Sequence, residues 1–216
     1  MTEELNFLYS VVVEKRKGLS MKKALLILFL LSFVVGTVTV PLADACVGKQ
    51  LHIGVTNSAE GIVLAEMIST IVNERTGTTV SVRLFKDEQE LYEAIKAKQV
   101  DIFIENTARA MQVLNKPAES DARKAYEVVK AVYEKELGLV WLKPFGFTNS
   151  GAGAPTYTAT ILRVEVVTNF PALPRVIDKL GSAITEESHA KLVRSVEAGE
   201  KPKKVARDFL KSKKLI

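Results

Sequence analysis

A chain of 216 residues can hold one medium-sized domain or two small ones, and a hydrophobic content of 47% is ordinary for a globular core. The formal net charge is +5, but its basic excess collects near the end of the chain, at 201–214, without a recognition motif or stacking aromatic residues, so nucleic-acid binding is not indicated. The single cysteine, Cys46, excludes an intrachain disulfide.

An apolar block before the main domain indicates export. Lys22-Lys23 directly precedes the apolar run 24–40, and Ala43-Asp44-Ala45 follows it with the small-x-small pattern of a cleavage site. We therefore predict a signal peptide over 21–45 and treat 1–20 as an over-extended start outside the fold. A permanent membrane anchor is the alternative, because the run is close to the ~17-residue lower limit for spanning a bilayer.

Cys46 directly follows the predicted cleavage site. It is either the lipid-anchored cysteine of a lipoprotein or a free thiol near the new N-terminus, and Ala43 and Asp44 fit a lipoprotein signal poorly. We expect a mature protein in the periplasm or on the extracytoplasmic face of the envelope, with membrane contact through the signal segment or a lipid only.

The remaining residues alternate between strand and helix patterns. Short runs with β-branched residues predict strands at 51–55, 80–85, 100–104, 139–142 and 159–164. Capping boxes at 57–60 and 87–90, apolar periodicity and stop glycines predict helices beginning near 57, 87, 107, 121, 172, 186 and 202. Strand–helix alternation of this kind is typical of βαβ crossovers and a parallel sheet, so we predict one α/β domain.

Catalytic constellations are hard to find in this sequence. His52 is expected to be a strand side chain and His189 a solvated helix residue, and neither has a cysteine or carboxylate at metal-ligand spacing. Gly151-Ala-Gly153 lacks the Gly-Lys-Ser/Thr ending of a phosphate-binding loop. We predict a protein that binds and is not an enzyme, with no cofactor and no metal.

Four motifs occur in an order that resembles a known family. They are I-G-V-T-N-S-A-E-G-I-V-L-A-E-M at 53–67, V-D-I-F-I-E-N-T-A-R at 100–109, G-L-V-W-L-K-P-F-G-F-T-N at 138–149 and V-A-R-D-F-L-K-S-K-K-L at 205–215. They are similar to I-G-S-K-N-F-T-E-Q-L-I-L-G-E-M, I-D-I-Y-P-E-Y-T-G-T, G-L-x-W-L-x-P-x-G-F-N-N and V-A-x-x-F-L-K-x-x-x-L. These runs belong to substrate-binding proteins of glycine betaine, choline and carnitine ABC importers.

The resemblance implies one lobe of a type II periplasmic-binding-protein fold, with a central, mostly parallel sheet and helices on both faces. In the family a second lobe follows the G-F-N-N segment, whereas here a short loop at 150–158 takes its place. A lobe with its own core needs at least ~50 residues. We therefore expect the second lobe to be absent and 46–216 to form a single lobe.

The resemblance also implies where a quaternary ammonium ligand would lie, inside a box of aromatic faces that attract a cation. The matching positions in this chain are Asn57, Ser58, Gly61, Asn106, Thr107, Asn149 and Gly151. The family's aromatic residues are replaced at three of these positions, by Ser58, Asn106 and Gly151 or a neighbour of it. Asn57 and Thr107 either contact a ligand or cap helices, and capping is favoured.

The resemblance implies an extracytoplasmic solute-binding component with a degenerate quaternary-ammonium site. Its expected partners are an ABC permease and ATPase complex or a second copy of itself, with a small organic solute as a possible ligand. The alternative is an interaction or scaffold protein of the envelope that kept the surface of the lobe and lost the solute.

Overall fold

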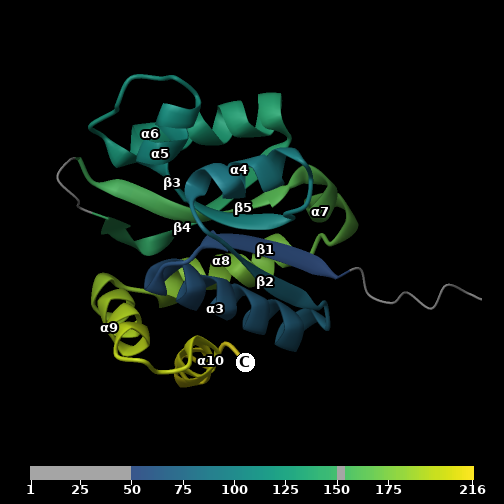
Figure 1. Ribbon diagram of the computed structural model, residues 1–216, viewed down its shortest axis with the longest axis vertical. Helices are drawn as coiled ribbons and strands as arrows, with labels where there is room; N and C mark the ends of the chain where they lie inside the picture. Colours follow the sequence, from purple (N-terminus) through teal and green to yellow (C-terminus); the bar gives the residue numbers. More distant parts are fainter. Residues whose placement is uncertain (1–49, 150–153) are drawn as a thin grey trace, which may run out of the picture. The chain divides into compact units, whose positions relative to one another are not determined.

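The computed structural model describes residues 50–149 and 154–216, and its elements are numbered as in Figure 1. At its centre lies a five-stranded sheet with the order β2-β1-β3-β5-β4. Its strands are β1 (Leu51–Thr56), β2 (Val80–Phe85), β3 (Ile102–Asn106), β4 (Leu139–Asn149) and β5 (Thr156–Arg163). β1 pairs in parallel with β2 and β3, whereas β5 runs antiparallel to both of its neighbours, β3 and β4. The sheet is therefore mixed: β1, β2, β3 and β4 share one direction, as predicted for a mostly parallel sheet, but β5 opposes them, so two of the four neighbouring pairs are antiparallel.

Helices cover both faces of the sheet (Figure 1). One face carries α3 (Ala59–Thr76), α8 (Leu173–Ala183), α9 (Glu186–Glu197) and α10 (Pro202–Ser212). The other carries α4 (Glu88–Lys96), α5 (Thr107–Val113), α6 (Ala122–Val132) and the π-helical turn η2 (Tyr133–Leu137). The short helix α7 (Val164–Asn169) leads from β5 towards α8.

Each face of the sheet has its own hydrophobic core. Leu51, Ile53 and the buried side of α3 belong to the first core, and Phe103, Tyr133 and Trp141 belong to the second. The segment Val47–Ile216 forms one compact unit that contains both cores. A unit of this size with its own core meets the conditions for folding independently.

The last two strands differ from the prediction. β4 continues from the predicted 139–142 to Asn149, and β5 begins at Thr156, inside the predicted loop 150–158. β4 lies at the edge of the sheet, where a proline, which has no backbone N–H to donate, is tolerated. The register of its pairing with β5 shifts on both sides of Pro144. Helix α7 was not predicted.

Close backbone contact fixes β4 against α8. A Cβ atom at Gly146 would lie 2.3 Å from the carbonyl oxygen of Ile184 and 2.9 Å from that of Gly181. Only glycine fits at position 146 without moving the backbone, so the G-F segment of the third motif serves packing.

Candidate functional site

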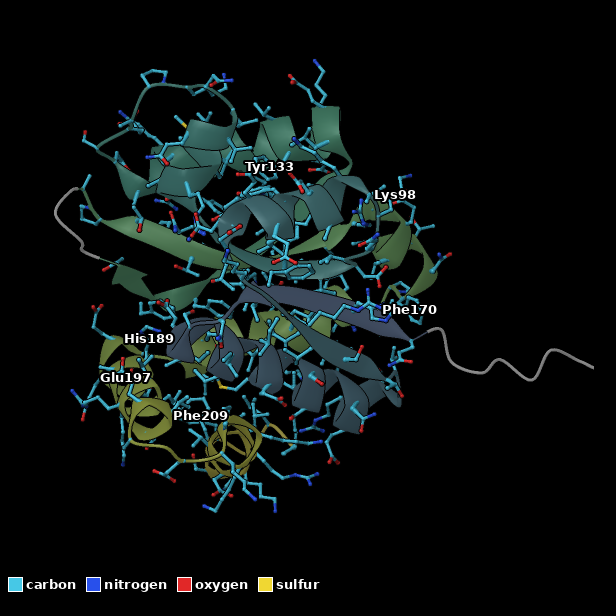
Figure 2. All side chains as sticks on the ribbon, in the orientation of Figure 1. Lys98, Tyr133, Phe170, His189, Glu197 and Phe209 are labelled. Carbon is cyan, nitrogen blue, oxygen red and sulfur yellow. The ribbon has the colours of Figure 1, made fainter. Side chains whose placement is uncertain are left out.

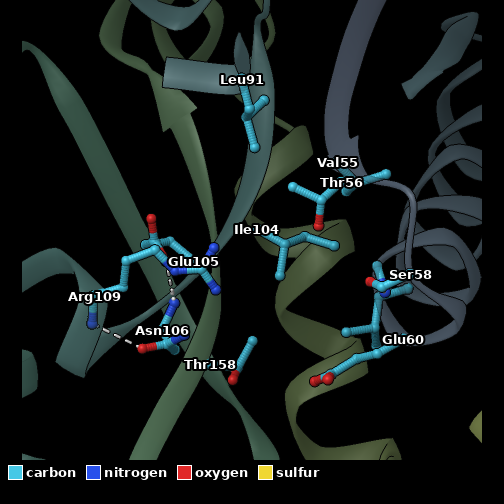
Figure 3. Close-up of a pocket in the computed structure, with 12 residues that line it drawn as sticks. Val55, Thr56, Ser58, Glu60, Leu91, Ile104, Glu105, Asn106, Arg109 and Thr158 are labelled. Atoms are coloured by element: carbon cyan, nitrogen blue, oxygen red, sulfur yellow. Dashed lines mark hydrogen bonds and ion pairs between the residues drawn. The ribbon is translucent and has the colours of Figure 1, made fainter. Parts of the chain in front are cut away.

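The candidate site is a small open pocket at the carboxyl ends of β1 and β3, the edge of an α/β sheet where ligands commonly bind. Figure 3 shows Ser58 and Glu60 on one side and Glu105, Asn106 and Arg109 on the other, with Thr158 of β5 between them. The lining residues are Val55, Thr56, Ser58, Glu60, Gly61, Leu64, Leu91, Ile104, Glu105, Asn106, Arg109 and Thr158. The volume of ≈ 80 Å³ is well below the roughly 300–1,000 Å³ of sites that enclose a small ligand.

Two of the expected ligand positions are helix caps. The hydroxyl oxygen of Ser58 accepts a hydrogen bond from the backbone N–H of Gly61 at 3.0 Å, at the start of α3. The amide oxygen of Asn106 accepts one from the N–H of Arg109 at 2.9 Å, at the start of α5. The prediction that Asn57 and Thr107 cap these helices is therefore wrong by one residue in each case. Asn57 precedes the true cap, and Thr107 follows it.

Thr107 has a different structural role. Its side chain is buried, and its hydroxyl oxygen accepts a hydrogen bond from the backbone N–H of Tyr157 at 3.2 Å. This bond fastens the start of β5 to the start of α5. Asn57 is exposed, and its backbone N–H donates to the carbonyl oxygen of Phe85, which links the ends of β1 and β2.

The remaining expected positions are distributed unevenly. Gly61 lines the pocket in the first turn of α3. A Cβ atom there would lie 3.0 Å from the Ser58 oxygen and 3.1 Å from the carbonyl oxygen of Thr56, so the site is tight for any larger residue. Asn149 is the last residue of β4. Gly151 and Cys46 lie outside the described residues.

The centre of the site is a buried carboxylate that the sequence reasoning did not single out. Glu105 is 3% exposed, and its oxygens accept hydrogen bonds from the Tyr92 hydroxyl and, at 2.8 Å, from the Asn106 backbone N–H. The Arg109 Nε lies 3.1 Å from Oε1 of Glu105, and the same guanidinium pairs with Glu88. A charged residue inside the buried-type run V-D-I-F-I-E is the signal that could have identified it.

Burial decides the electrostatics of this cluster. It raises the pKa of Glu105 above its usual value, although Arg109, the Tyr92 hydroxyl and the Asn106 N–H all favour the ionised form. Burial, reinforced by the neighbouring carboxyl group, also raises the pKa of Tyr92, so this phenol keeps its proton and donates a hydrogen bond to Glu105. Glu105 therefore already has its partners within the protein.

Among the described residues, no aromatic side chain lines the pocket, although the Tyr92 hydroxyl reaches Glu105. A separate aromatic group consists of Tyr126, Tyr133, Trp141 and Tyr157, whose rings meet edge to face. Tyr126 also donates a hydrogen bond to the carbonyl oxygen of Leu142 at 2.9 Å. These rings pack against one another and against β4 and β5, as expected of core residues.

Neither a metal-binding cluster nor a membrane-spanning helix occurs among the described residues. Across 50–149 and 154–216, no three side chains of His, Cys, Asp or Glu gather in a way that could hold a metal ion. Over the same ranges, no helix combines the length and the hydropathy that a membrane crossing requires.

Comparison with solved structures shows the fold. A glycine betaine/carnitine/choline ABC transporter structure matches with a TM-score of 0.71 at 12% identity, over 76% of this chain and 99% of the other. Apo YehZ from Escherichia coli matches with a TM-score of 0.70 at 14% identity, over 78% and 100%. Lactococcal OpuAC in its closed-liganded conformation with glycine betaine matches with 0.52 at 8% identity, over 77% and 96%. The chain shares its fold with these three proteins.

Sequence identities this low show the fold but not the family, which a family model establishes. Residues 49–160 match the model of the substrate binding domain of the ABC-type glycine betaine transport system, OpuAC. The match covers more than half of the chain, including β1, β3 and the whole lining of the pocket. The chain belongs to the substrate-binding domain family of ABC-type glycine betaine transport systems.

Proposed function

We propose that this protein is an extracytoplasmic binding component, associated with or descended from a betaine-type ABC importer, whose quaternary-ammonium site is degenerate. The carrying observation is the pocket lining, which over the described part of the chain has carboxylates, hydroxyls and aliphatic groups but no aromatic face. Cation–π contacts contribute about 0.5–2 kcal/mol each, so a box of several rings supplies much of the affinity for such a cation.

The two carboxylates of the pocket do not replace the missing rings. Glu105 is held by Tyr92, Asn106 and Arg109, and Glu60 lies 3.4 Å from the His189 imidazole. A permanent cation would have to compete with these existing partners. Loss of three aromatic contacts at ~1.4 kcal/mol each weakens binding about a thousandfold.

Titration calorimetry tests this proposal. Residues 47–216 would be titrated with glycine betaine, choline and carnitine, with lactococcal OpuAC as the positive control for glycine betaine. We expect no low-micromolar dissociation constant for any of the three. A low-micromolar value for one of them would show that the site is functional and the proposal wrong.

An interaction role is the second candidate, and the open pocket favours it. The pocket opens at the sheet edge, and Ser58, Asn106 and Arg109 reach its surface above the buried apolar side chains of its floor. A partner would therefore contact a mainly polar rim, as is usual at the margin of a protein–protein interface. The partner would be a permease or a second copy of the chain.

Sedimentation of residues 47–216, alone and with a candidate permease, tests this role. Lys86 directly follows the carboxyl end of β2, at the same sheet edge as the pocket. Lys96 is the last residue of α4, at the end of that helix away from this edge. Lys86→Glu should weaken association while Lys96→Glu leaves it unchanged. A strict monomer, or association that survives Lys86→Glu, would count against the interaction role.

A further inference from the structure

The last helix together with its flanks holds more than the whole net charge of the chain. Residues 201–216 contain seven basic residues and one acidic residue, whereas the other 200 residues contain 23 basic and 24 acidic residues. Most of the chain is thus neutral, and the basic excess belongs to α10 and its flanks. Solubility alone does not require such a concentration, because charges of both signs are usually interspersed over a surface.

These cations share one side of the helix. Lys204, Arg207 and Lys211 recur at intervals of three and four residues, so they lie on one face. Lys203 and Lys214 flank them, and all five are exposed. We call these five residues the basic face of α10. The opposite side, with Val205, Ala206 and Leu210, is buried against the first core.

The basic face of α10 begins at the border with α3 and continues into solvent. The helix packs along α3, where Arg207 pairs with Glu74 and Lys203 lies near Glu66, and nitrogen-tipped side chains of α10 also project into solvent (Figure 2). Charges three or four residues apart are separated by about 5–6 Å along the helix axis. This distance is shorter than the Debye length of about 8 Å at physiological salt, so neighbouring charges act together on a charged surface. The basic face is therefore a coherent cationic surface.

Nearby carboxylates neutralise only part of it. Lys204 pairs with Asp208 at 2.8 Å, and Arg207 pairs with Glu74. Among the described residues, neither Lys211 nor Lys214 has a carboxylate oxygen within 4.0 Å of its ammonium group. Lys203 has no such ion pair either, although its charge lowers the pKa of Glu66, which burial raises.

We propose that the basic face of α10 binds the anionic phospholipid surface of a membrane. Four of its five cations are lysines, whose compact ammonium groups suit a diffuse field of headgroups, whereas bidentate recognition of one phosphate favours arginine. Polybasic segments gain affinity for anionic lipid with each lysine or arginine near the surface. Binding here is electrostatic, since the apolar side of the helix is occupied by the core.

This inference is independent of the proposed solute site, which lies at the carboxyl edge of the sheet. It agrees with the expected export of the chain, which would bring the domain close to the envelope lipids. A polybasic patch and a lipid chain are two weak signals that together give stable membrane attachment. The basic face would supply one of them whether or not Cys46 is lipidated.

Vesicle sedimentation tests the proposal on residues 47–216, which lack both Cys46 and the apolar run. We expect binding to vesicles that contain roughly one-third phosphatidylglycerol, no binding to pure phosphatidylcholine, and loss of binding between roughly 0.05 M and 0.5 M NaCl. Equal binding to both kinds of vesicle, or binding that salt does not weaken, would overturn the proposal.

Two triple variants with the same change in net charge locate the effect. Lys203→Gln, Lys211→Gln and Lys214→Gln together should weaken binding by about 100-fold, at roughly fivefold for each lysine. The control replaces Lys96, Lys116 and Lys124 with Gln, all exposed and remote in sequence from α10, and should stay within about twofold of the wild type.

The remaining outcomes also decide the question. Equal losses in the two triple variants would mean that overall charge, and not this face, attracts the lipid. Binding to heparin or a DNA oligonucleotide in the absence of vesicle binding would assign the face to a different polyanion. Either result overturns the proposal, and thermal unfolding of each variant confirms that the comparison is between folded proteins.

Discussion

The imidazole ring of His189 lies flat on the ring of Phe147, with centroids 3.6 Å apart and planes 6° from parallel. Its Nε2 atom is 3.4 Å from Oε1 of Glu60, in the first turn of α3. One side chain of α9 therefore contacts both β4 and the rim of the pocket. The prediction that His189 is a solvated helix residue is wrong, because its side chain is only 13% exposed.

This stacking predicts a measurable loss of stability. His189→Ala should lower the free energy of unfolding by about 1–2 kcal/mol, since it removes a packed ring from its partner. The exposed Lys191, two residues along α9, is the control, and Lys191→Ala should change stability by less than about 0.5 kcal/mol. Urea unfolding measures both. Equal effects of the two substitutions would show that the ring contact contributes nothing.

The N-cap of α3 gives a second prediction with an adjacent control. Ser58→Ala should destabilise the protein by about 1 kcal/mol, because the N–H of Gly61 loses its acceptor. Asn57→Ala, one residue earlier, should have a much smaller effect. Thermal unfolding of both variants is the measurement. The reverse order would place the cap at Asn57, as the sequence had led us to expect.

Thr107 gives a third prediction, about the attachment of β5. Thr107→Val keeps the shape of the buried side chain but removes the acceptor of the half-buried Tyr157 N–H, which should cost about 1–3 kcal/mol. Thr107→Ser keeps the hydroxyl and should cost less. If valine is tolerated better than serine when unfolding is followed in urea, the hydrogen bond does not hold β5.

Glu105 makes stability depend on pH. Its pKa in the folded state lies above the ordinary value of 4.5, so between these two values the folded protein binds more protons than the unfolded chain. The free energy of unfolding therefore falls as the pH rises through this interval. Above it, Glu105 is ionised in both states, and the desolvation of the buried carboxylate destabilises the fold in full. Glu105→Gln removes this dependence.

The measurement is a series of urea unfolding curves from about pH 4 to about pH 9 for both proteins. The unfolding free energy of the wild type minus that of Glu105→Gln should decrease with rising pH. If this difference increases instead, Arg109 and Tyr92 outweigh burial, and the pKa of Glu105 is lowered.

Much of the first half of the fold could be predicted from the sequence. Gly77, in the left-handed conformation at φ 70°, ends α3 as expected, and Asp87 caps α4 as its capping box indicated. These signals are local, since each depends on a few neighbouring residues. α7 was missed because V-E-V-V-T-N is rich in β-branched residues and reads as a continuation of the preceding strand.

The site was harder to predict because it depends on contacts between distant segments. Three of the family-matched positions, Ser58, Gly61 and Asn106, line the pocket. Sequence matching did not identify Glu105, whose importance comes from Tyr92 on α4 and Arg109 on α5. It also assigned the two caps to the wrong neighbours, because Asn, Ser and Thr all serve as caps and their spacing alone does not choose between them.

The pairing of β4 with β5 determines where this fold can accept an added segment. The two strands stay together along their whole length, from Leu139 opposite Arg163 to Asn149 opposite Thr156. The chain thus leaves and re-enters the sheet at adjacent points, the arrangement in which an inserted domain is best tolerated. An insertion between Asn149 and Thr156 would therefore leave the pairing of β4 with β5 in place. The same position is the natural place to graft a foreign domain onto this scaffold.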